Sequence, residues 1–118
     1  MKHKHYAPKA EVILVEGNIP DVVAKIKGIA ESYRLKGKKV GILATDETQT
    51  AYRAEVVESL GSRSDLATVA QSLFRLLREV DAEGVDVMIA EGVSSEGLGL
   101  AVMNRLRKAS GYHIVKAE

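Results

Sequence analysis

Short, unbroken apolar runs that alternate with helix-forming segments are the feature that most constrains how this chain can fold. Residues 11–16 (Glu-Val-Ile-Leu-Val-Glu) and 39–44 (Lys-Val-Gly-Ile-Leu-Ala) have the pattern of strands buried on both faces of a parallel sheet. Residues 85–90 repeat this pattern and predict a fourth strand. Residues 55–60 and 112–115 predict a third and a fifth strand, the fifth at an edge of the sheet.

Three segments between these strands carry apolar residues at helical spacing. The first helix is expected to begin at Pro20, which suits a first helical turn, and to end before Gly37. The second begins at Ser62 or Ser64, and the third follows residues 94–99. The roughly ten residues between the second and third strands leave room only for a short helix. This order predicts an α/β fold with a doubly wound, mainly parallel five-stranded sheet of Rossmann-like type and helices on both faces.

Composition narrows the classes of function. A length of 118 residues suits one domain, and the absence of cysteine excludes a disulfide framework, a thiolate zinc site and a cysteine nucleophile. No apolar run approaches the roughly 18 to 20 residues that cross a bilayer, so a cytoplasmic protein without membrane contact is expected. With 17 Lys and Arg against 16 Asp and Glu, the chain has no broad positive field, and direct nucleic-acid binding is not expected.

Candidate ligand loops lie where ligands bind in open parallel sheets, outside the carboxyl ends of the strands. Asp46 and Thr48 follow the second strand and can contact a sugar or a cation, although such a loop more often only turns the chain. Ser94 and Ser95 precede a helix, where hydroxyl and backbone N–H groups can bind a phosphate. Alternatively, one of these serines caps the helix while nearby glycines allow it to pack closely. The ligand interpretation corresponds to a free-standing module that binds a nucleotide or another small ligand.

Familiar catalytic and cofactor motifs are missing from the sequence. The pair Gly97-Leu-Gly99 has Val102 where the third glycine of a dinucleotide-binding fingerprint belongs, and no GxxxxGK[ST] loop is present. His3 and His5 supply two potential metal ligands without a third, so no metal site is expected. No Ser-His-Asp pattern is present either, and we assign no catalytic residue.

The first residues carry a more specific motif. Residues 1–8, Met-Lys-His-Lys-His-Tyr-Ala-Pro, resemble the interdomain linker Ser-Pro-Gly-Met-Lys-Tyr-x-His-Tyr-Ala-Pro of the two-domain threonylcarbamoyl-adenylate synthases, with His3 in place of the usual tyrosine. Further segments resemble the C-terminal domain of the same family: residues 72–81, 84–86, 97–99 and 103–109. The resemblance spans nearly the whole chain. It divides the chain into an interdomain linker remnant, residues 1–10, and a Rossmann-like accessory domain, residues 11–118.

The resemblance implies an accessory, regulatory role in a larger enzyme. The parent family are nucleotidyltransferases that condense threonine, bicarbonate and ATP into threonylcarbamoyl-AMP and pyrophosphate, for threonylcarbamoyladenosine modification of tRNA. Lys2, His5 and Tyr6 match linker residues that close over the active site of an N-terminal catalytic domain, the expected partner in cis or in trans. ATP and Mg²⁺ are expected to act in the parent enzyme. The isolated domain is expected to be inactive and to hold no cofactor.

Overall fold

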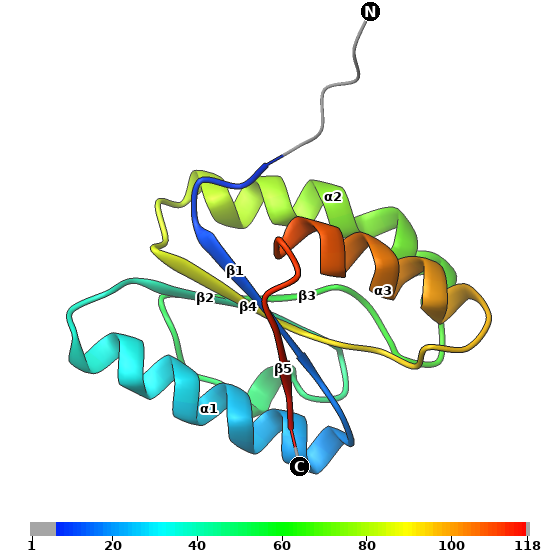
Figure 1. Cartoon of the computed structure of the whole chain (residues 1–118), viewed down its shortest axis with the longest axis horizontal. Coiled ribbons are helices and arrows are strands. Elements are labelled where there is room, and N and C mark those ends of the chain that lie inside the picture. The colour runs from blue at the N-terminus through cyan, green and yellow to red at the C-terminus, as the bar shows by residue number, and fades with distance from the viewer. Residues whose placement is uncertain (1–6, 118) are drawn as a thin grey trace, which may run out of the picture.

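The computed structural model describes residues 7–117 and contains a five-stranded sheet in which every strand is parallel to its neighbours. The elements, in chain order, are β1 (Glu11–Glu16), α1 (Ile19–Leu35), β2 (Val40–Ala44), the 3₁₀ helix η1 (Gln49–Ala51), β3 (Val56–Ser59), α2 (Leu66–Ala82), β4 (Val87–Glu91), α3 (Leu98–Ala109) and β5 (Ile114–Lys116). The strand order across the sheet is β3-β2-β4-β1-β5 (Figure 1). The predicted α/β class and five strands are confirmed, with the parallel arrangement complete.

The burial of each strand follows its place in the sheet. The central strands β2 and β4 are buried along their whole length, and β1 is buried from its second residue onward. The edge strands β3 and β5 are only partly buried. The unbroken apolar runs therefore marked the central strands correctly. The connection between β2 and β3 contains one short helix, the three-residue η1, as the length of this connection predicted.

Helices cover both faces of the sheet, which confirms the doubly wound arrangement (Figure 1). Helix α1 packs on one face through Val22, Ile26 and Ala30. Helices α2 and α3 lie together on the other face, where α2 alone buries five apolar side chains. Below, the carboxyl edge is the side of the sheet where the strands end, and the amino edge is the side where they begin. The chain enters at the amino edge, beside α2 (Figure 1).

Helix α2 begins differently from the expectation. Its N-cap is Asp65, whose side chain accepts a hydrogen bond from the backbone N–H of Thr68 at 3.3 Å. The prediction that Ser62 or Ser64 opens this helix is therefore wrong. Their hydroxyl groups instead lie 2.8 Å apart and bond to each other in the preceding loop. Because Asp and Ser cap helices about equally well, the sequence alone did not separate these positions.

Helix α3 also lacks the serine cap that the sequence suggested. Its N-cap is Gly97, with φ 58° and ψ −131°, a conformation that favours glycine. Ser94 accepts a hydrogen bond from the backbone of Glu96 at 3.3 Å, and Ser95 does not cap the helix either. The close packing expected of the two glycines is found only in part within residues 7–117. An added Cβ at Gly99 would lie 1.9 Å from the carbonyl oxygen of Ser94 in the preceding loop, whereas one at Gly97 would have no such neighbour within 4 Å.

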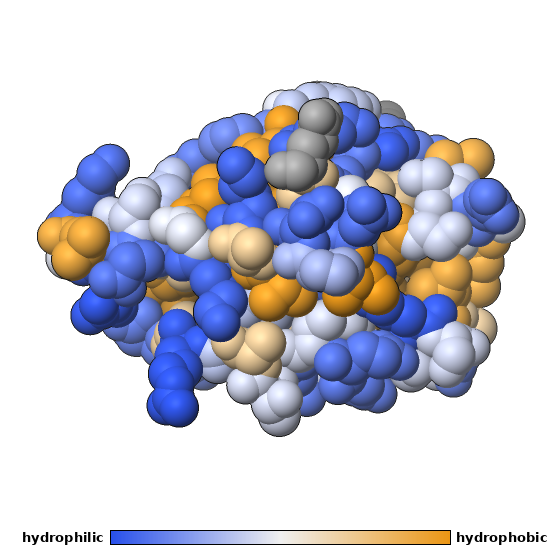
Figure 2. All heavy atoms as spheres, turned by 90° about the horizontal axis from the view of Figure 1, so that it is seen from below, coloured by the Kyte–Doolittle hydropathy of each residue, from blue (hydrophilic) through white to orange (hydrophobic). Residues whose placement is uncertain are grey.

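The surface on the α1 side is largely polar. Figure 2 shows hydrophilic side chains spread over this face, with apolar surface between them and toward its right-hand end. Large apolar side chains with substantial exposure include Leu35, the last residue of α1, and Leu98 and Leu100 at the start of α3. Among residues 7–117, no helix combines the length and the apolar character that crossing a bilayer requires.

Candidate functional site

The neighbouring strands β1 and β4 send their following helices to opposite faces of the sheet. Helix α1 leads from β1 to β2 on one face, and α3 leads from β4 to β5 on the other (Figure 1). Ligands in open α/β sheets bind at such a switch point, outside the carboxyl ends of the strands. Here β1 ends at Glu16 and β4 ends at Glu91. Two carboxylates therefore occupy the place where a ligand would be sought.

Glu91 is fully buried and accepts hydrogen bonds from four side chains, a group that we call the Glu91 cluster. Thr45 and Arg63 donate to one carboxylate oxygen at 2.9 Å each, and Thr48 and Tyr52 donate to the other. Arg63 also donates from Nε to the Thr45 hydroxyl at 3.1 Å. The donors come from the β2–β3 connection and from the loop before α2. Glu91 thus joins both segments to the end of β4.

The electrostatics of the Glu91 cluster favour a closed structural network. Burial, followed by the hydrogen bond to Glu91, raises the pKa of the Tyr52 hydroxyl far above its usual range, so it remains a proton donor. Arg63 forms an ion pair with Glu91, and the Arg63 side chain is 17% exposed. The positive charge that balances Glu91 therefore lies on the solvent side of the cluster. Within residues 7–117, no buried polar side-chain atom lacks a hydrogen-bond partner. The cluster therefore stabilises the edge and offers no free group for chemistry.

Glu16 is neutralised separately. Its carboxylate accepts hydrogen bonds from Arg107 at 2.9 and 3.2 Å and from Lys116 at 3.0 Å. The hydrogen bond from Arg107, helped by Lys116, lowers the pKa of Glu16 against the opposing effect of burial. A Cβ at Gly17 would lie 2.5 Å from the carbonyl oxygen of Ala117, so the backbones meet directly. The backbone of Ala117 therefore occupies the space directly beside Gly17 at the end of β1.

The predicted ligand-loop residues occupy three different settings. Thr48 lies inside the Glu91 cluster, with its hydroxyl buried. Asp46 is exposed and accepts a hydrogen bond from Ser59 at 2.6 Å. Ser94 and Ser95 are exposed in the loop before α3. The structure therefore brings Thr48 into a cluster but does not bring the other three residues to it. Their ligand role stays a prediction.

Sequence reasoning did not assign Glu91, Tyr52 or Arg63 to a common site. A glutamate directly after the apolar run of β4 was the available signal, because a buried carboxylate needs partners. The partners themselves lie 28 to 46 residues away along the chain. The predicted linker residues Lys2, His5 and Tyr6 lie outside the described residues.

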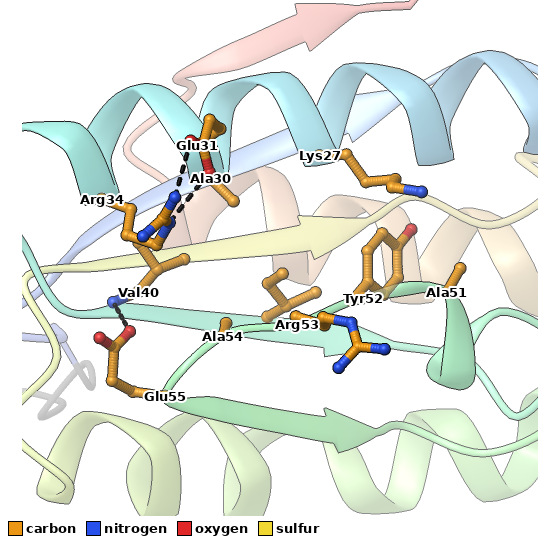
Figure 3. A pocket seen from close by; sticks show the side chains of 11 residues that line it. Lys27, Ala30, Glu31, Arg34, Val40, Ala51, Tyr52, Arg53, Ala54 and Glu55 are labelled. Atoms are coloured by element: carbon orange, nitrogen blue, oxygen red, sulfur yellow. Dashed lines mark hydrogen bonds and ion pairs between the residues drawn. The ribbon is translucent and has the colours of Figure 1, made fainter.

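A pocket of about 210 Å³ lies on the α1 side of the sheet, between α1 and residues 51–55. Figure 3 shows Tyr52 in this pocket, with Lys27 above the ring and Arg53 below it in the view. Glu31 accepts hydrogen bonds from Arg34 at 2.8 and 2.9 Å, so these two charges compensate each other. The side chains of Lys27 and Arg53 form no hydrogen bond or ion pair with other residues in the range 7–117. They leave two cations available to a small anion.

Fold and contacts together define an α/β domain whose carboxyl edge is filled by its own side chains. The described part of the chain presents no group of three or more His, Asp or Glu side chains that could hold a metal ion. Residues 1–111 match the family model described as "Threonylcarbamoyl-AMP synthase, C-terminal domain", and the chain belongs to this family.

The chain corresponds to the C-terminal domain of longer relatives. It is 50% identical over 116 residues to the threonylcarbamoyl-AMP synthase of Pyrococcus abyssi, a match that covers 98% of this chain and 32% of the relative. The crystal structure of P. abyssi Sua5 complexed with L-threonine aligns with a TM-score of 0.87 and 49% identity, over 100% of this chain and 33% of that one. The chain thus spans about a third of the length of the curated relatives that it matches.

A third relative consists of this domain alone. The crystal structure of the C-terminal Sua5 domain from Pyrococcus horikoshii aligns with a TM-score of 0.77 and 50% identity, over 94% of this chain and 100% of that chain. A homologous domain therefore folds without the rest of the protein, which supports experiments on the isolated domain.

Proposed function

We propose that this chain is the accessory domain of a threonylcarbamoyl-AMP synthase and that it presents a linker to the active site of an N-terminal catalytic domain. The observation that carries the proposal is the family match over residues 1–111, which includes the linker-like segment. In this proposal the parent enzyme is cytoplasmic, uses threonine, bicarbonate and ATP, and supplies tRNA modification. ATP and Mg²⁺ bind to the catalytic domain.

The charge pattern of the carboxyl edge supports placing nucleotide chemistry elsewhere. A triphosphate at the switch point would face the carboxylates of Glu16 and Glu91, whose cationic partners are already engaged. Bringing like charges together in a closed site is unfavourable. The Rossmann-like sheet would then act as a scaffold for the linker.

Lys2, His5 and Tyr6 are the linker residues to which we assign substrate closure. Lys2 and His5 can meet the negative charge of a phosphate, and Tyr6 can stack or donate a hydrogen bond. These residues bind and enclose substrate, and the catalytic domain performs the reaction.

Pyrophosphate release is the measurement that tests the accessory role. Release from ATP with threonine and bicarbonate is compared for this chain alone, for a family catalytic domain alone, for their mixture, and for the two joined at Met1. We expect no release by this chain and a faster rate for the joined protein than for the catalytic domain. Equal rates with and without this chain, in both the mixture and the joined protein, would contradict the proposal.

Substitutions in the joined enzyme test the linker itself. Lys2→Ala, His5→Ala and Tyr6→Ala are each expected to lower kcat/KM by about 10- to 100-fold, the effect of losing a charge-assisted or buried hydrogen bond. Lys4→Ala is the matched control in the same segment and should have little effect. Unchanged kcat/KM in all three variants would show that the linker assignment is wrong.

A second candidate function, binding of a small ligand, is favoured by the pocket around Lys27 and Arg53. Its volume lies below the roughly 300 to 1,000 Å³ of pockets for drug-sized ligands, so a small anion fits better than a nucleotide. The melting temperature of the domain is measured with phosphate, pyrophosphate, threonine and AMP. A rise that disappears in Lys27→Gln with Arg53→Gln supports this function, and no rise with any of the four refutes it.

A further inference from the structure

The chain enters the domain at a point where Asp81 binds two consecutive backbone amides. Asp81 accepts a hydrogen bond from the N–H of Lys9 at 3.0 Å and another from the N–H of Ala10 at 2.9 Å, each with a different carboxylate oxygen. Ala10 is itself buried and leads directly into β1. The end of segment 1–10 is thus attached to the end of α2 across 71 and 72 residues of sequence.

Helix stability does not explain an acidic residue at this position. Asp81 lies in the last turn of α2, which contains no basic residue and where the helix dipole presents partial negative charge. A carboxylate is unfavourable there. The hydrogen bonds that it accepts from two N–H donors are charge-assisted and stabilise the carboxylate, against the effect of the helix dipole. The contact with Lys9 and Ala10 therefore accounts for an acid in an otherwise poor location.

The attachment also limits how far the linker can reach. Tyr6 precedes Lys9 by three residues, and Lys2 precedes it by seven. An extended chain spans at most about 3.6 Å per residue, so the Cα atoms of Tyr6 and Lys2 can lie no more than about 11 and 25 Å from that of Lys9. A fixed exit point therefore sets an upper limit on how far these linker residues can reach.

We infer that Asp81 is a positioning residue for the linker. By holding Lys9 and Ala10, it fixes the point and the direction in which the chain leaves the domain. It thereby raises the effective concentration of Lys2 and Tyr6 at the active site of the catalytic domain. The inference rests on the proposed function, and Asp81 acts through the linker without touching substrate.

Amide hydrogen exchange in the isolated chain tests the attachment independently of activity. Asp81→Asn keeps the size of the side chain but turns an NH₂ group toward one of the two amides. We expect faster exchange at Lys9 and Ala10, with the exchange of the β1 amides unchanged. Glu79→Gln is the matched control, because its carboxylate lies on the same helix and, among residues 7–117, pairs only with Arg75. Unchanged exchange at Lys9 and Ala10 in Asp81→Asn would overturn the inference.

Kinetics of the joined two-domain enzyme separate positioning from a general structural role. We expect Asp81→Asn to lower kcat/KM by about three- to tenfold when the linker is intact. It should have no further effect when Lys2, His5 and Tyr6 are all replaced by alanine, because no functional linker is then left to position. Glu79→Gln should behave as the parent enzyme does in both backgrounds.

The two backgrounds also distinguish the possible failures. An equal loss of kcat/KM in both backgrounds would identify Asp81 as merely structural and overturn the inference. Full activity of Asp81→Asn beside a strong effect of the linker substitutions would overturn the inference but leave the proposed function in place. Linker substitutions without effect would instead refute the proposed function itself.

Discussion

The two edges of the sheet hold their chain segments by different means. At the carboxyl edge, Glu91 and Glu16 are buried and bind side chains from several elements. At the amino edge, Asp81 accepts hydrogen bonds from the main-chain amides of Lys9 and Ala10, close to solvent. The contacts at the carboxyl edge are buried and join several elements, whereas the contact at the amino edge joins the end of α2 to the residues before β1. The edge at which α/β sheets commonly bind ligands thus stabilises this fold, and the opposite edge is available to direct the linker.

Removing the Glu91 carboxylate is expected to have the largest effect on stability. Glu91→Ala leaves Arg63 without its anion and leaves the hydroxyls of Thr45, Thr48 and Tyr52 without their acceptor. We expect the free energy of unfolding to fall by about 3 to 5 kcal/mol, the usual effect of breaking a buried ion pair. Urea denaturation followed by circular dichroism measures this change.

The control for this prediction is a glutamate at the same edge without such contacts. Glu96 is exposed, and its carboxylate accepts no hydrogen bond from other residues within 7–117, so Glu96→Ala should leave stability nearly unchanged. A loss below about 1 kcal/mol in Glu91→Ala would show that the carboxyl edge does not depend on the Glu91 cluster.

The fold was predictable where local pattern and burial agree. The apolar run of residues 11–16 defines β1 with the same limits in the sequence and in the structure. The helical spacing of apolar residues likewise located α2, because an amphipathic face of this length has few alternative structures. The helix starts were missed, since Ser62 and Asp65 are both suitable caps and the exact exit from β3 decides between them.

The candidate sites were less predictable because they depend on contacts between distant segments. Tyr52 and Glu91 are 39 residues apart, and nothing in either local sequence specifies that they meet. Asp81 ends the segment 72–81, which resembles the family, but its contact with Ala10 exists only because the fold brings the end of α2 to the start of β1. Side-chain pairing across a sheet follows from topology, which sequence periodicity only outlines.

Close packing at the carboxyl edge predicts the second largest effect. Gly99→Ala would place a Cβ 1.9 Å from the carbonyl oxygen of Ser94, so the loop before α3 must shift. We expect a loss of about 1 to 3 kcal/mol in the free energy of unfolding, as for overpacked positions generally. The matched control is Gly28→Ala in α1, where the added Cβ would meet no atom of residues 7–117 within 4 Å apart from the backbone of its own helical turn.

The two glycine substitutions should change stability in opposite directions. Alanine at Gly28 is expected to raise the free energy of unfolding by about 0.5 to 1 kcal/mol, because alanine is the better helix former. Thermal unfolding of both variants measures the contrast. An increase in stability for Gly99→Ala would indicate that the loop at the carboxyl edge yields easily and is not closely packed.

The ion pairs of Glu16 predict a smaller, pH-dependent effect. Arg107 lowers the pKa of Glu16 below its value in the unfolded chain, so Glu16 stabilises the fold above that unfolded pKa. This stabilisation is lost as the pH falls through the folded pKa. At pH 7 we expect Glu16→Gln to lower the free energy of unfolding by about 1 to 2 kcal/mol, since its partners are partly exposed.

Denaturation at several pH values checks the sign of this effect. The difference between the parent protein and Glu16→Gln should shrink from pH 7 toward pH values below the folded pKa of Glu16. Glu96→Gln provides the control at the same edge and should give a small difference throughout. A difference for Glu16→Gln that grows on acidification would contradict the assigned direction of the pKa shift.

The smallest expected effect is the coupling between the two edges. Glu16 ends β1 and Ala10 directly precedes the strand, and six residues of extended chain span about 20 Å. Sites more than about 10 Å apart without shared partners usually act independently. The double variant Glu16→Gln with Asp81→Asn should therefore be destabilised by the sum of the single effects, within about 0.5 kcal/mol.

In the joined enzyme, Asp81→Asn should lower kcat/KM by the same factor with and without Glu16→Gln. A coupling above 1 kcal/mol, about fivefold in an equilibrium, would mean that the carboxyl edge also influences the linker exit. The division of roles between the two edges would then have to be abandoned.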